Sequence, residues 1–567
     1  MQWREDPRSI VEEVYEEATK RGFSQPVAAF LGRSTAISNL DDLKRLLDRN
    51  SQDLHSPLLL NDMESAVSRL ARALENFEKI LIFGDFDVDG LCGATILYWG
   101  LKKARSGFNP SVYIPDRFKE GHGLSKPLIK QFHQDEIDLI VTADCGMGSP
   151  DAIELAKELG IDVLVTDHHP FETDLVGAYS IINPKLGAYP FKDLAGSGVA
   201  FKLIQALLEA IHGVESDVYN SFVENCIEYV AVGTIADVVP LVGENRILTH
   251  LGLNHMMESR LPFISDYWIK NVIQKDLGEK FRVSHVGFKM APLLNASSRL
   301  ESPYPAFRFL TSKNAEEVVR HGKYLEVLNQ ERRRRMNLLM ESEQMEIFHI
   351  ENIPLSVVHT HSSELGLLGL VAARMSGERG CAVIALGHSP DGLLRGSGRG
   401  PGSPPLQEVY RLADHYLEGF GGHDQAAGLQ LKPHNLPNFI EDLKRLKMAW
   451  ENTHRSEPEI FNCSIKASDL GRELLTELDL IEPFGPGFEA PLFRLEGFEI
   501  RRLKRIGADG QHISFQIKGR ENQLIKVIGF GLGEDEESIR CAKYLIGYLE
   551  FNYFRRAEVQ LRLVAHE

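Results

Sequence analysis

Residues 80–90 read Ile80-Leu81-Ile82-Phe83-Gly84-Asp85-Phe86-Asp87-Val88-Asp89-Gly90. The apolar residues at 80–83 are typical of a short buried strand. They run into three aspartates at alternate positions, and the apolar run 91–101 that follows predicts a helix. Like charges this close repel, so a loop that holds them together needs a cation. Because α/β sheets bind ligands at the carboxyl ends of their strands, the stretch predicts a metal site at such an edge.

An aspartate-rich loop on its own is also typical of solvated turns and helix caps. The pattern D-x-D-x-D-G also opens the calcium loop of an EF-hand, which requires a glutamate at its twelfth position. Counting from Asp85, that position is Ile96, and an apolar run rather than a helix precedes Asp85. Calcium is therefore disfavoured, and the carboxylate oxygens favour Mg²⁺ or Mn²⁺.

The composition of the whole chain restricts its class. A length of 567 residues suggests about three or four domains. No apolar run reaches the roughly 18 residues of a membrane helix, and the charged N-terminus lacks the apolar core of a secretory signal. The six cysteines are scattered without a C-x-x-C pair, which argues against a zinc ribbon or a disulfide framework and fits a reducing cytoplasm.

The net charge of −17 argues, taken alone, against a polyanionic partner. Charge is local, however, and carboxylates that bind metal inflate the formal count. An acidic chain can still hold nucleic acid in particular grooves.

Between residues 76 and 250, strand and helix patterns alternate, which predicts βαβ units and a mostly parallel sheet. The expected strands are 80–83, 111–114, 139–142, 163–166 and 180–182. Asp144 follows the third of these and Asp167-His168-His169 the fourth, while Asp237 follows a further apolar run, 230–235, that we also expect to be a strand. One aspartate after a strand is often a helix cap, and His168 alone could be a core histidine. Their recurrence predicts a carboxylate–imidazole metal site without the cysteines of a structural zinc.

Anion sites are predicted at several points. Arg117 precedes the flexible Gly121-His122-Gly123 and could fork onto a phosphate or form a surface salt bridge. The small residues of 195–200 could begin an anion-binding helix or serve close packing. Glycine-rich segments at 395–400 and 419–428 would let backbone amides approach a phosphate. The basic run 331–335, on a helix expected over 315–348, could be a solvated face or could meet a polyanion.

From residue 455 onward, short β-like runs predict a small barrel of the OB type, which binds single strands by stacking bases in a basic groove. The expected strands are 492–494, 498–500, 513–517, 525–530, 543–549 and 559–564. The candidate contacts are Phe551, Tyr553, Phe554, Arg555 and Arg556, although aromatic residues there could equally form the barrel core.

These motifs together resemble the DHH phosphoesterase superfamily. The four sequence motifs that carry the resemblance are 84–90, Asp144, 167–169 and Asp237, and Gly421-Gly422-His423-Asp424-Gln425-Ala426-Ala427-Gly428 is similar to the GGHxxAAG motif of the companion DHHA1 domain. Within the superfamily the chain most resembles the RecJ family of single-strand-specific 5′→3′ DNA exonucleases. Further segments that match that family in order are 189–196, 294–296 with Arg299, 395–399 and 482–487.

The resemblance covers nearly the whole chain and implies an α/β multidomain fold. The implied fold comprises a parallel-sheet DHH domain, a smaller α/β DHHA1 domain joined by a long helix, and a C-terminal OB-type β-barrel. We expect an N-terminal helical lead-in over 1–75, the DHH catalytic domain over 76–250, a helical connector over 251–350, the DHHA1 domain over 351–435 and the nucleic-acid-binding OB domain over 455–567.

The resemblance also implies roles for single residues. Two divalent ions, Mn²⁺ or Mg²⁺, would be shared by Asp85, Asp87 and Asp89, with Asp144 bridging and with His168 and Asp237 completing the second site. His169 would lie beside the substrate phosphate, and His423 would face the scissile phosphate from the second domain. The positions of a 5′-phosphate clamp are Arg117, Arg299, Ser397 and Arg399, and Tyr553 and Arg555 would contact the strand on the barrel.

The implied activity is release of 5′-mononucleotides from 5′ ends of single-stranded DNA by two-metal hydrolysis, in DNA repair and recombination. The implied setting is a cytoplasmic monomer away from membranes, with a single-strand-binding protein and a helicase as partners. One alternative is a DHH-family oligoribonuclease or small-nucleotide phosphodiesterase, which the terminal barrel and the arginine-rich connector disfavour. A second is a non-catalytic single-strand binder, which the full set of ligand positions disfavours.

The chain departs from the family pattern at several positions, and Tyr553 stands near where tryptophan is frequent. His122 stands where tyrosine is frequent, Ser298 where glycine is usual, and Phe488 where asparagine is common. These departures affect the expected grip on the substrate and the barrel rather than the metal ligands.

Overall fold

The computed structural model describes the chain except at residues 1–2, 171–175, 274–279, 343–344, 351–352, 446–458, 508 and 553–557, and the side chains of 272, 273, 522 and 552. The candidate contacts Tyr553 and Arg555 therefore lie outside the described residues, as do Phe554 and Arg556. In the described part of the chain, a helix that could cross a lipid bilayer is absent.

The first α/β unit is built on a five-stranded sheet in the order β3-β2-β4-β5-β6. Every neighbouring pair is parallel, which confirms the parallel sheet expected from the sequence. The strands are β2 (Ile80–Gly84), β3 (Ser111–Tyr113), β4 (Leu139–Ala143), β5 (Asp162–Thr166) and β6 (Ser180–Ile182). Strands β2 and β4 are buried throughout, as their unbroken apolar sequences predict.

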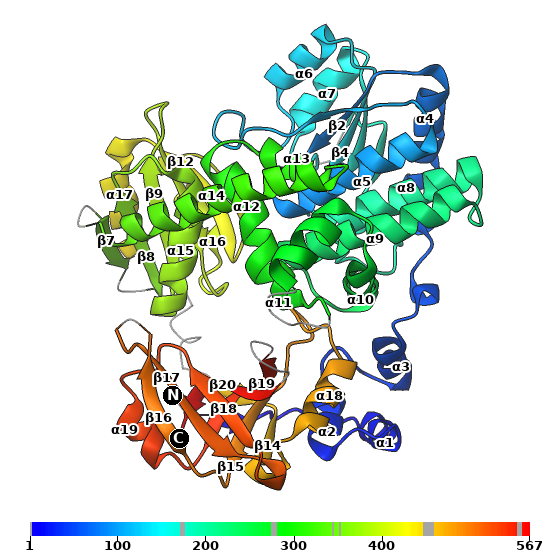
Figure 1. Cartoon of the computed structure of the whole chain (residues 1–567). Helices are drawn as coiled ribbons and strands as arrows, with labels where there is room; N and C mark the ends of the chain where they lie inside the picture. The colour runs from blue at the N-terminus through cyan, green and yellow to red at the C-terminus, as the bar shows by residue number, and fades with distance from the viewer. Residues whose placement is uncertain are drawn as a thin grey trace.

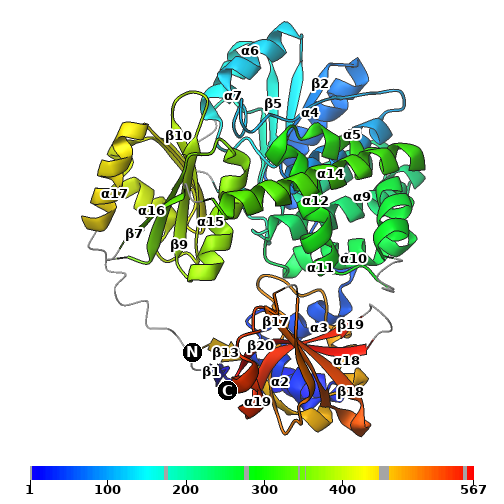
Figure 2. The ribbon, with the colours of Figure 1, turned by 60° about the vertical axis from the view of Figure 1, so that its left-hand side comes forward.

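Helices cover both faces of this sheet because successive side chains of a strand point to opposite sides. Ile80 and Ile82 share a core with α4 (Met63–Asn76), α5 (Val88–Ala104), α8 (Gly196–His212) and α9 (Asp217–Asp237). Leu81 and Phe83 share another core with α6 (Lys126–Gln134) and α7 (Pro150–Glu158). Figures 1 and 2 show these layers in the blue to green part of the ribbon.

The prediction of a strand at 230–235 is wrong, because these residues form the last turns of helix α9. The helix is buried between α5, α8 and α10 (Gly243–His255), so apolar residues occupy nearly its whole circumference. A short apolar run inside such a helix has the same sequence appearance as a buried strand.

A helical region follows and packs on the core of the first unit through residues such as Phe263, Leu293 and Phe309. Its elements are a π-helical segment (Phe263–Ile273), α11 (Val283–His285), a second π-helical turn (Val286–Met290), α12 (Ala291–Leu300), α13 (Tyr304–Leu310) and α14 (Ala315–Met340). Helix α14 ends earlier than expected, because residues 345–350 pair with the next strand as β7.

The second α/β unit has a six-stranded mixed sheet in the order β11-β12-β10-β9-β8-β7. The strands are β7 (Met345–Ile350), β8 (Leu355–Thr360), β9 (Ala382–His388), β10 (Leu394–Arg399), β11 (Leu417–His423) and β12 (Ala426–Leu431). Only β8 and β9 are parallel neighbours among these pairs. The helices are α15 (Leu365–Arg379), α16 (Leu406–Leu412) and α17 (Leu436–Arg445), and Leu436 and Phe439 place α17 in the core of this unit.

The C-terminal unit is a seven-stranded sheet in the order β14-β15-β19-β20-β18-β17-β16. Its strands are β14 (Cys463–Lys466), β15 (Leu492–Glu496), β16 (Arg501–Ile506), β17 (His512–Lys518), β18 (Leu524–Gly529), β19 (Leu545–Asn552) and β20 (Glu558–His566), with helices α18 (Arg472–Leu480) and α19 (Glu536–Cys541). The prediction of a strand at 498–500 is wrong, because these residues form irregular structure just before β16.

The N-terminal region packs on the C-terminal unit. Strand β1 (Trp3–Glu5) pairs in parallel with β13 (Glu459–Phe461), and helices α1 (Glu12–Lys20), α2 (Gln25–Arg33) and α3 (Leu40–Asp48) share one hydrophobic core with the C-terminal sheet. Figures 1 and 2 show these blue helices beside the orange and red strands. The N-terminal helices therefore complete the C-terminal unit, whereas α4 belongs to the first sheet.

The segment 481–488 attaches the C-terminal unit to helix α10. The guanidinium of Arg246 is buried, donates from Nη2 to the carbonyl of Ile481 over 2.7 Å and also donates to the carbonyl of Pro483. It lies 4.7 Å from the ring centre of Phe488, which also packs on Phe30 and Phe484. The departure at Phe488 thus serves the packing of this junction.

We predict that Arg246→Met destabilises the protein by about 2–4 kcal/mol, because two carbonyls lose a buried charged donor. Thermal unfolding would show a lower midpoint, and limited proteolysis would release the C-terminal unit sooner. Arg472→Met, which alters an exposed arginine of α18, is the matched control. Equal stability of the two variants would contradict the role given to Arg246.

Candidate active site

The predicted metal ligands meet at the carboxyl edge of the parallel sheet. Three overlapping sets of ligand atoms each lie within 4.8 Å of one another: Asp85, Asp87 and Asp144; Asp89, His168 and Asp237; and Asp144, His168 and His169. Asp85, Asp144 and the histidines follow strands β2, β4 and β5, whereas Asp237 is the last residue of helix α9. All six predicted metal ligands are thereby brought together, although one arrives on a helix.

Backbone amides hold two of the aspartates in place. Asp87 caps helix α5, accepting hydrogen bonds from the amides of Asp89 and Gly90 at 3.0 and 3.1 Å. Asp89 accepts from the amides of Gly196 and Ser197, at 2.7 and 3.1 Å, at the N-terminus of α8. The helix start that the sequence offered as an anion site therefore binds an anion of the chain itself.

Close packing at the same helix start is also required. A Cβ atom added at Gly233 would lie 2.4 Å from Oδ1 of Asp89, and one at Gly196 would lie 2.4 Å from Oδ1 of Asp144. Asp144 itself has a φ of 63°, an uncommon conformation for a non-glycine residue that costs roughly 1–3 kcal/mol. Packing from three helices and strands thus fixes the carboxylates in positions that the isolated loops would not favour.

Several polar atoms of this cluster have no hydrogen-bond partner although they are buried. They are Oδ1 of Asp85, Oδ1 of Asp144, Nε2 of His168 and Oδ2 of Asp237. The Nε2 atom of His168 lies 3.1 Å from Asp144 Oδ1 and 3.6 Å from Asp237 Oδ2. Unsatisfied buried atoms that converge in this way indicate a bound ion, and carboxylates with one imidazole suit Mn²⁺ or Mg²⁺.

Charge repulsion leads to the same conclusion. Burial, together with the charges of Asp89 and Asp87, raises the pKa of Asp237 to about 8 and that of Asp144 well above its usual value. Burial also raises the pKa of Asp89 to about 6, although hydrogen bonds from residues 196 and 197 oppose the shift. Without a cation the carboxylates would hold protons, so the site fits a divalent metal.

The two histidines of the motif differ in protonation. Burial and the neighbouring charge of His169 lower the pKa of His168 to about 3, which leaves the neutral imidazole that a metal binds. Burial alone would lower the pKa of His169, but the hydrogen bond and charge of Asp167 raise it to about 9. Asp167 accepts from Nδ1 of His169 at 2.8 Å and from the amide of Met147 at 3.0 Å. His169 is therefore suited to an anion rather than a metal.

The second α/β unit contributes His423 from the end of β11. Its ring stacks on that of His169, with centroids 6.1 Å apart and planes inclined by 6°. The histidine expected to face the substrate from the second unit is thus beside the one expected to face it from the first.

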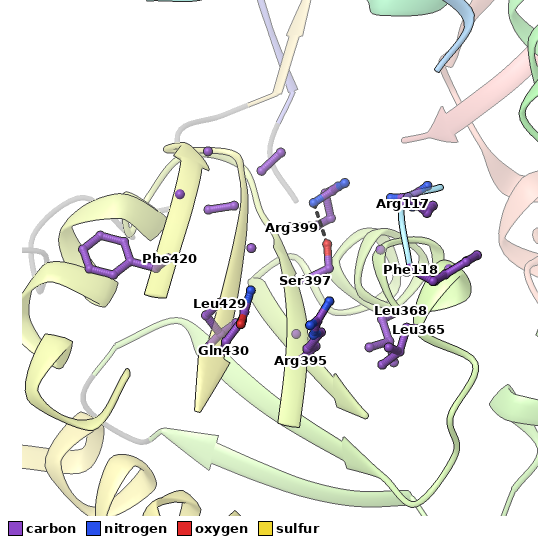
Figure 3. Close-up of a pocket in the computed structure, with 18 of the residues that line it drawn as sticks. Arg117, Phe118, Leu365, Leu368, Arg395, Ser397, Arg399, Phe420, Leu429 and Gln430 are labelled. Atoms are coloured by element: carbon purple, nitrogen blue, oxygen red, sulfur yellow. Dashed lines mark hydrogen bonds between the residues drawn. The ribbon is translucent and has the colours of Figure 1, made fainter. Parts of the chain in front are cut away.

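A cavity of about 720 Å³ lies between the two α/β units. Its lining includes Arg117, Arg299, Ser397 and Arg399, and Asp87 connects it to the metal ligands. Figure 3 shows Arg117 and Arg399 near each other, with a hydrogen bond from Arg399 to Ser397. A glycine of α15, Gly369, allows the helix to approach this arginine closely.

Three of the four arginines that line the cavity form no ion pair with a described carboxylate. Among the described residues, Arg117, Arg299 and Arg399 form no ion pair with a carboxylate, whereas Arg395 on the same wall pairs with Asp391 at 2.8 Å. Burial and the charges of neighbouring arginines lower the pKa of Arg299 to about 9. Partly buried guanidinium groups that repel one another favour a bound anion, and their planar donors match a phosphate.

His122 and Lys185 lie near the ligands but were not assigned roles from the sequence, whereas Asp167 was predicted among the carboxylate ligands and belongs to none of the ligand sets found among the described residues. His122 lies 3.5 Å from Asp85 through Nε2 and Oδ1, Lys185 donates to the carbonyl of His168 over 2.5 Å, and Asp167 orients His169. The position of Lys185 shortly after strand β6 could have indicated it. The departure at His122 thus places an imidazole beside the carboxylates. The departure at Ser298 is buried, and its hydroxyl donates a hydrogen bond to the carbonyl of Asn295.

Two of the four arginines in the basic run of α14 form ion pairs within the protein. Arg334 and Arg335 pair with Glu331 at 2.7 Å, and Arg335 also pairs with Glu364. Arg332 donates to the side chain of Asn329 over 3.0 Å. Much of the run therefore forms an ion-paired face.

Comparisons with known proteins match all three units. The DHH family, N-terminal domain, matches residues 79–234, the DHHA1 domain matches 355–448 and the RecJ OB domain matches 461–565. The single-stranded-DNA-specific exonuclease RecJ of Bacillus subtilis is 32% identical over 91% of this chain, which spans 64% of that longer relative. RecJ of Salmonella typhimurium is 31% identical, with 79% of this chain and 80% of the relative covered.

A crystal structure of RecJ from Thermus thermophilus in complex with Mn²⁺ has the same architecture. It superposes with a TM-score of 0.78 and 25% sequence identity, covering 100% of this chain and 79% of that one.

We predict that Asp144→Asn has opposite effects on the metal-free and metal-bound protein. The pKa of the Asp144 carboxyl is higher in the folded protein than in the unfolded chain. The folded state therefore loses stability as the pH rises above the unfolded pKa and the carboxyl has to ionise. In EDTA near pH 8, the variant should unfold at a higher temperature than wild type. Mn²⁺ at a hundredfold excess over its dissociation constant should stabilise wild type by about 2.7 kcal/mol and the variant far less.

Asp151→Asn, at an exposed position of α7, should behave as wild type in both conditions. Equal stabilisation of Asp144→Asn and wild type by Mn²⁺ would exclude Asp144 as a ligand.

Proposed function

Because the chain belongs to the family of RecJ single-stranded-DNA-specific exonucleases, we propose that it degrades single-stranded DNA from the 5′ end and releases 5′-mononucleotides. The observation that carries the proposal is the junction of two sites in one cavity. Asp87 of the carboxylate cluster and the unpaired arginines Arg117, Arg299 and Arg399 line the same space. A terminal phosphate held by the arginines would present the next phosphodiester to the carboxylates.

Two divalent ions fit the carboxylate cluster as we propose it. One would lie among Asp85, Asp87 and Asp144, and the other among Asp89, His168 and Asp237, with Asp144 shared. Bound ions would supply the Lewis acidity that activates the attacking water and offsets the charge that develops on the phosphate. The fold itself positions these carboxylates, without help from the ions. Backbone amides donate to Asp87 and Asp89, and packing keeps the backbone of Asp144 in its uncommon conformation.

The chain's own residues orient the substrate in this proposal. Asp167 fixes the Nδ1 proton of His169 and so leaves Nε2 available to donate to a phosphate oxygen. His423, stacked on His169, approaches the same phosphate from the other α/β unit. Arg117, Arg399 and Ser397 would bind the terminal phosphate, which has more charge than an internal one and therefore gains more from them.

Strand specificity would follow from the passage between the two α/β units, which we infer is too narrow for a duplex. The C-terminal OB-type sheet, with Tyr553 and Arg555 as proposed contacts, would hold the strand upstream.

On the same family basis we propose a cytoplasmic monomer that acts in repair and recombination, on DNA supplied by a helicase and a single-strand-binding protein. The three larger sheets support the proposed units 76–250, 351–435 and 455–567, with the connector 251–350. Helix α17 extends the second unit, and the lead-in helices α1–α3 complete the third.

A strand-polarity assay tests this function. With Mn²⁺ or Mg²⁺, a long single strand should lose a 5′ label as mononucleotides, and a blunt duplex should resist. Asp85→Asn should slow the reaction by at least about 10²–10³-fold, the usual effect of losing one electrostatic stabiliser. Preference for dinucleotides or for pAp would instead favour the small-substrate phosphodiesterase, and binding without cleavage would favour the non-catalytic binder.

We predict that Arg399→Ala lowers kcat/KM on 5′-phosphorylated strands about ten- to hundredfold, since a charge-assisted hydrogen bond contributes about 1.5–3 kcal/mol. Activity on 5′-hydroxyl strands should change little. Arg395→Ala is the matched control, because Arg395 lines the same cavity but is already paired with Asp391. An equal loss on both kinds of end in Arg399→Ala would contradict the phosphate clamp.

A further inference from the structure

Three histidines converge in the second α/β unit, apart from the residues of the active site. His359 is near the end of β8, His361 follows that strand directly, and His388 ends β9. Strands β8 and β9 are parallel neighbours, so both carboxyl ends lie at one edge of the sheet (Figure 1). One ring nitrogen from each histidine lies within 4.8 Å of the other two.

The spacing of the nitrogens is that of metal ligands. Nε2 of His359 lies 3.3 Å from Nε2 of His388. Two imidazole nitrogens bound tetrahedrally to zinc, each at about 2.0–2.1 Å, are separated by about 3.3–3.4 Å. The same 3.3 Å separation also fits a hydrogen bond between the two rings, so the assignment to a metal depends as well on the third imidazole and on the carboxylate partner of His359.

A carboxylate sets the tautomer of the buried member. Nδ1 of His359 lies 3.1 Å from Oε2 of Glu346 on β7, so Nδ1 donates and the lone pair of Nε2 points to His388. Carboxylate–histidine–metal arrangements of this kind orient ligand rings in metalloproteins. His359 is buried, His388 is partly buried and His361 is exposed, which leaves a route by which an ion can enter and a position for solvent.

The ligand chemistry differs from that of the active site. The carboxylate oxygens there suit Mn²⁺ or Mg²⁺, whereas three imidazoles favour borderline ions such as Zn²⁺. We propose that His359, His361 and His388 form a second metal site that binds Zn²⁺, or Co²⁺ as its spectroscopic substitute. No residue is shared with the carboxylate cluster.

The place of the site in the fold indicates what an ion would brace. His388 donates its amide to the carbonyl of Ser362 over 3.1 Å, so the loop after β8 is tied to the end of β9. That loop leads into α15, where Gly366 and Gly369 line the arginine cavity. An ion held by both strands would fix the start of this helix.

The site can be tested on the full chain with Zn²⁺ alone as the probe and with Mn²⁺ in large excess to occupy the carboxylate cluster. Wild type should retain one equivalent of Zn²⁺ after desalting, and Co²⁺ should give the visible absorption of a histidine-bound ion. His361→Ala, at an exposed position, and His388→Ala should each weaken Zn²⁺ binding by at least about 100-fold. His415→Ala, an exposed histidine of the same unit, should bind as wild type does.

The nuclease activity of His361→Ala with Mn²⁺ should stay within about twofold of wild type, which separates this site from the proposed function. A wild-type protein that retains no Zn²⁺ would show that the histidines form a hydrogen-bonded cluster only. Equal Zn²⁺ retention by wild type and His361→Ala would likewise overturn the proposal.

Discussion

The structure depends on how the chain holds like charges together out of water. Asp85, Asp89 and Asp144 are exposed by only 4%, 1% and 2%. Burial, together with the charges of neighbouring carboxylates, raises their pKa values and favours protonation over ionisation. The N-terminus of α8 satisfies Asp89, but facing atoms of Asp85, Asp144, Asp237 and His168 remain without partners. The parallel sheet, the strained Asp144 and the close glycine contacts all maintain an arrangement that only cations complete.

The arginine cavity presents the reverse situation, since it gathers Arg117, Arg299 and Arg399, which form no ion pair with a described carboxylate. A net charge of −17 argues against a polyanion only if charge is taken as uniform over the surface. Here the acidic cluster and the basic pocket adjoin at Asp87. In the function that we propose, the end of a nucleic acid strand would meet the guanidinium groups, and the neighbouring phosphate would meet ions held by the carboxylates. What the cavity can bind is therefore set by the guanidinium and carboxylate groups that line it, rather than by the net charge of the chain.

The sequence predicted those parts of the site whose signal is local. Strand β2 with its aspartates, and the residues after β4 and β5, were identifiable because buried strands and their polar ends are adjacent in the chain. Asp237 was predicted to follow a strand at 230–235, because a short apolar run does not distinguish a buried helix from a strand. The pairing of β1 with β13 and the contact of Gly233 with Asp89 arise between distant segments, for which a single sequence has no pattern.

The most direct test of the two-metal site is a crystal structure with Mn²⁺ that uses anomalous diffraction at the manganese absorption edge. Two peaks are expected, one among Asp85, Asp87 and Asp144 and one among Asp89, His168 and Asp237. The bound ions should give each of the unpartnered oxygen and nitrogen atoms a partner. A cluster without manganese, in which the same carboxylates hold protons at neutral pH, would contradict the two-metal site.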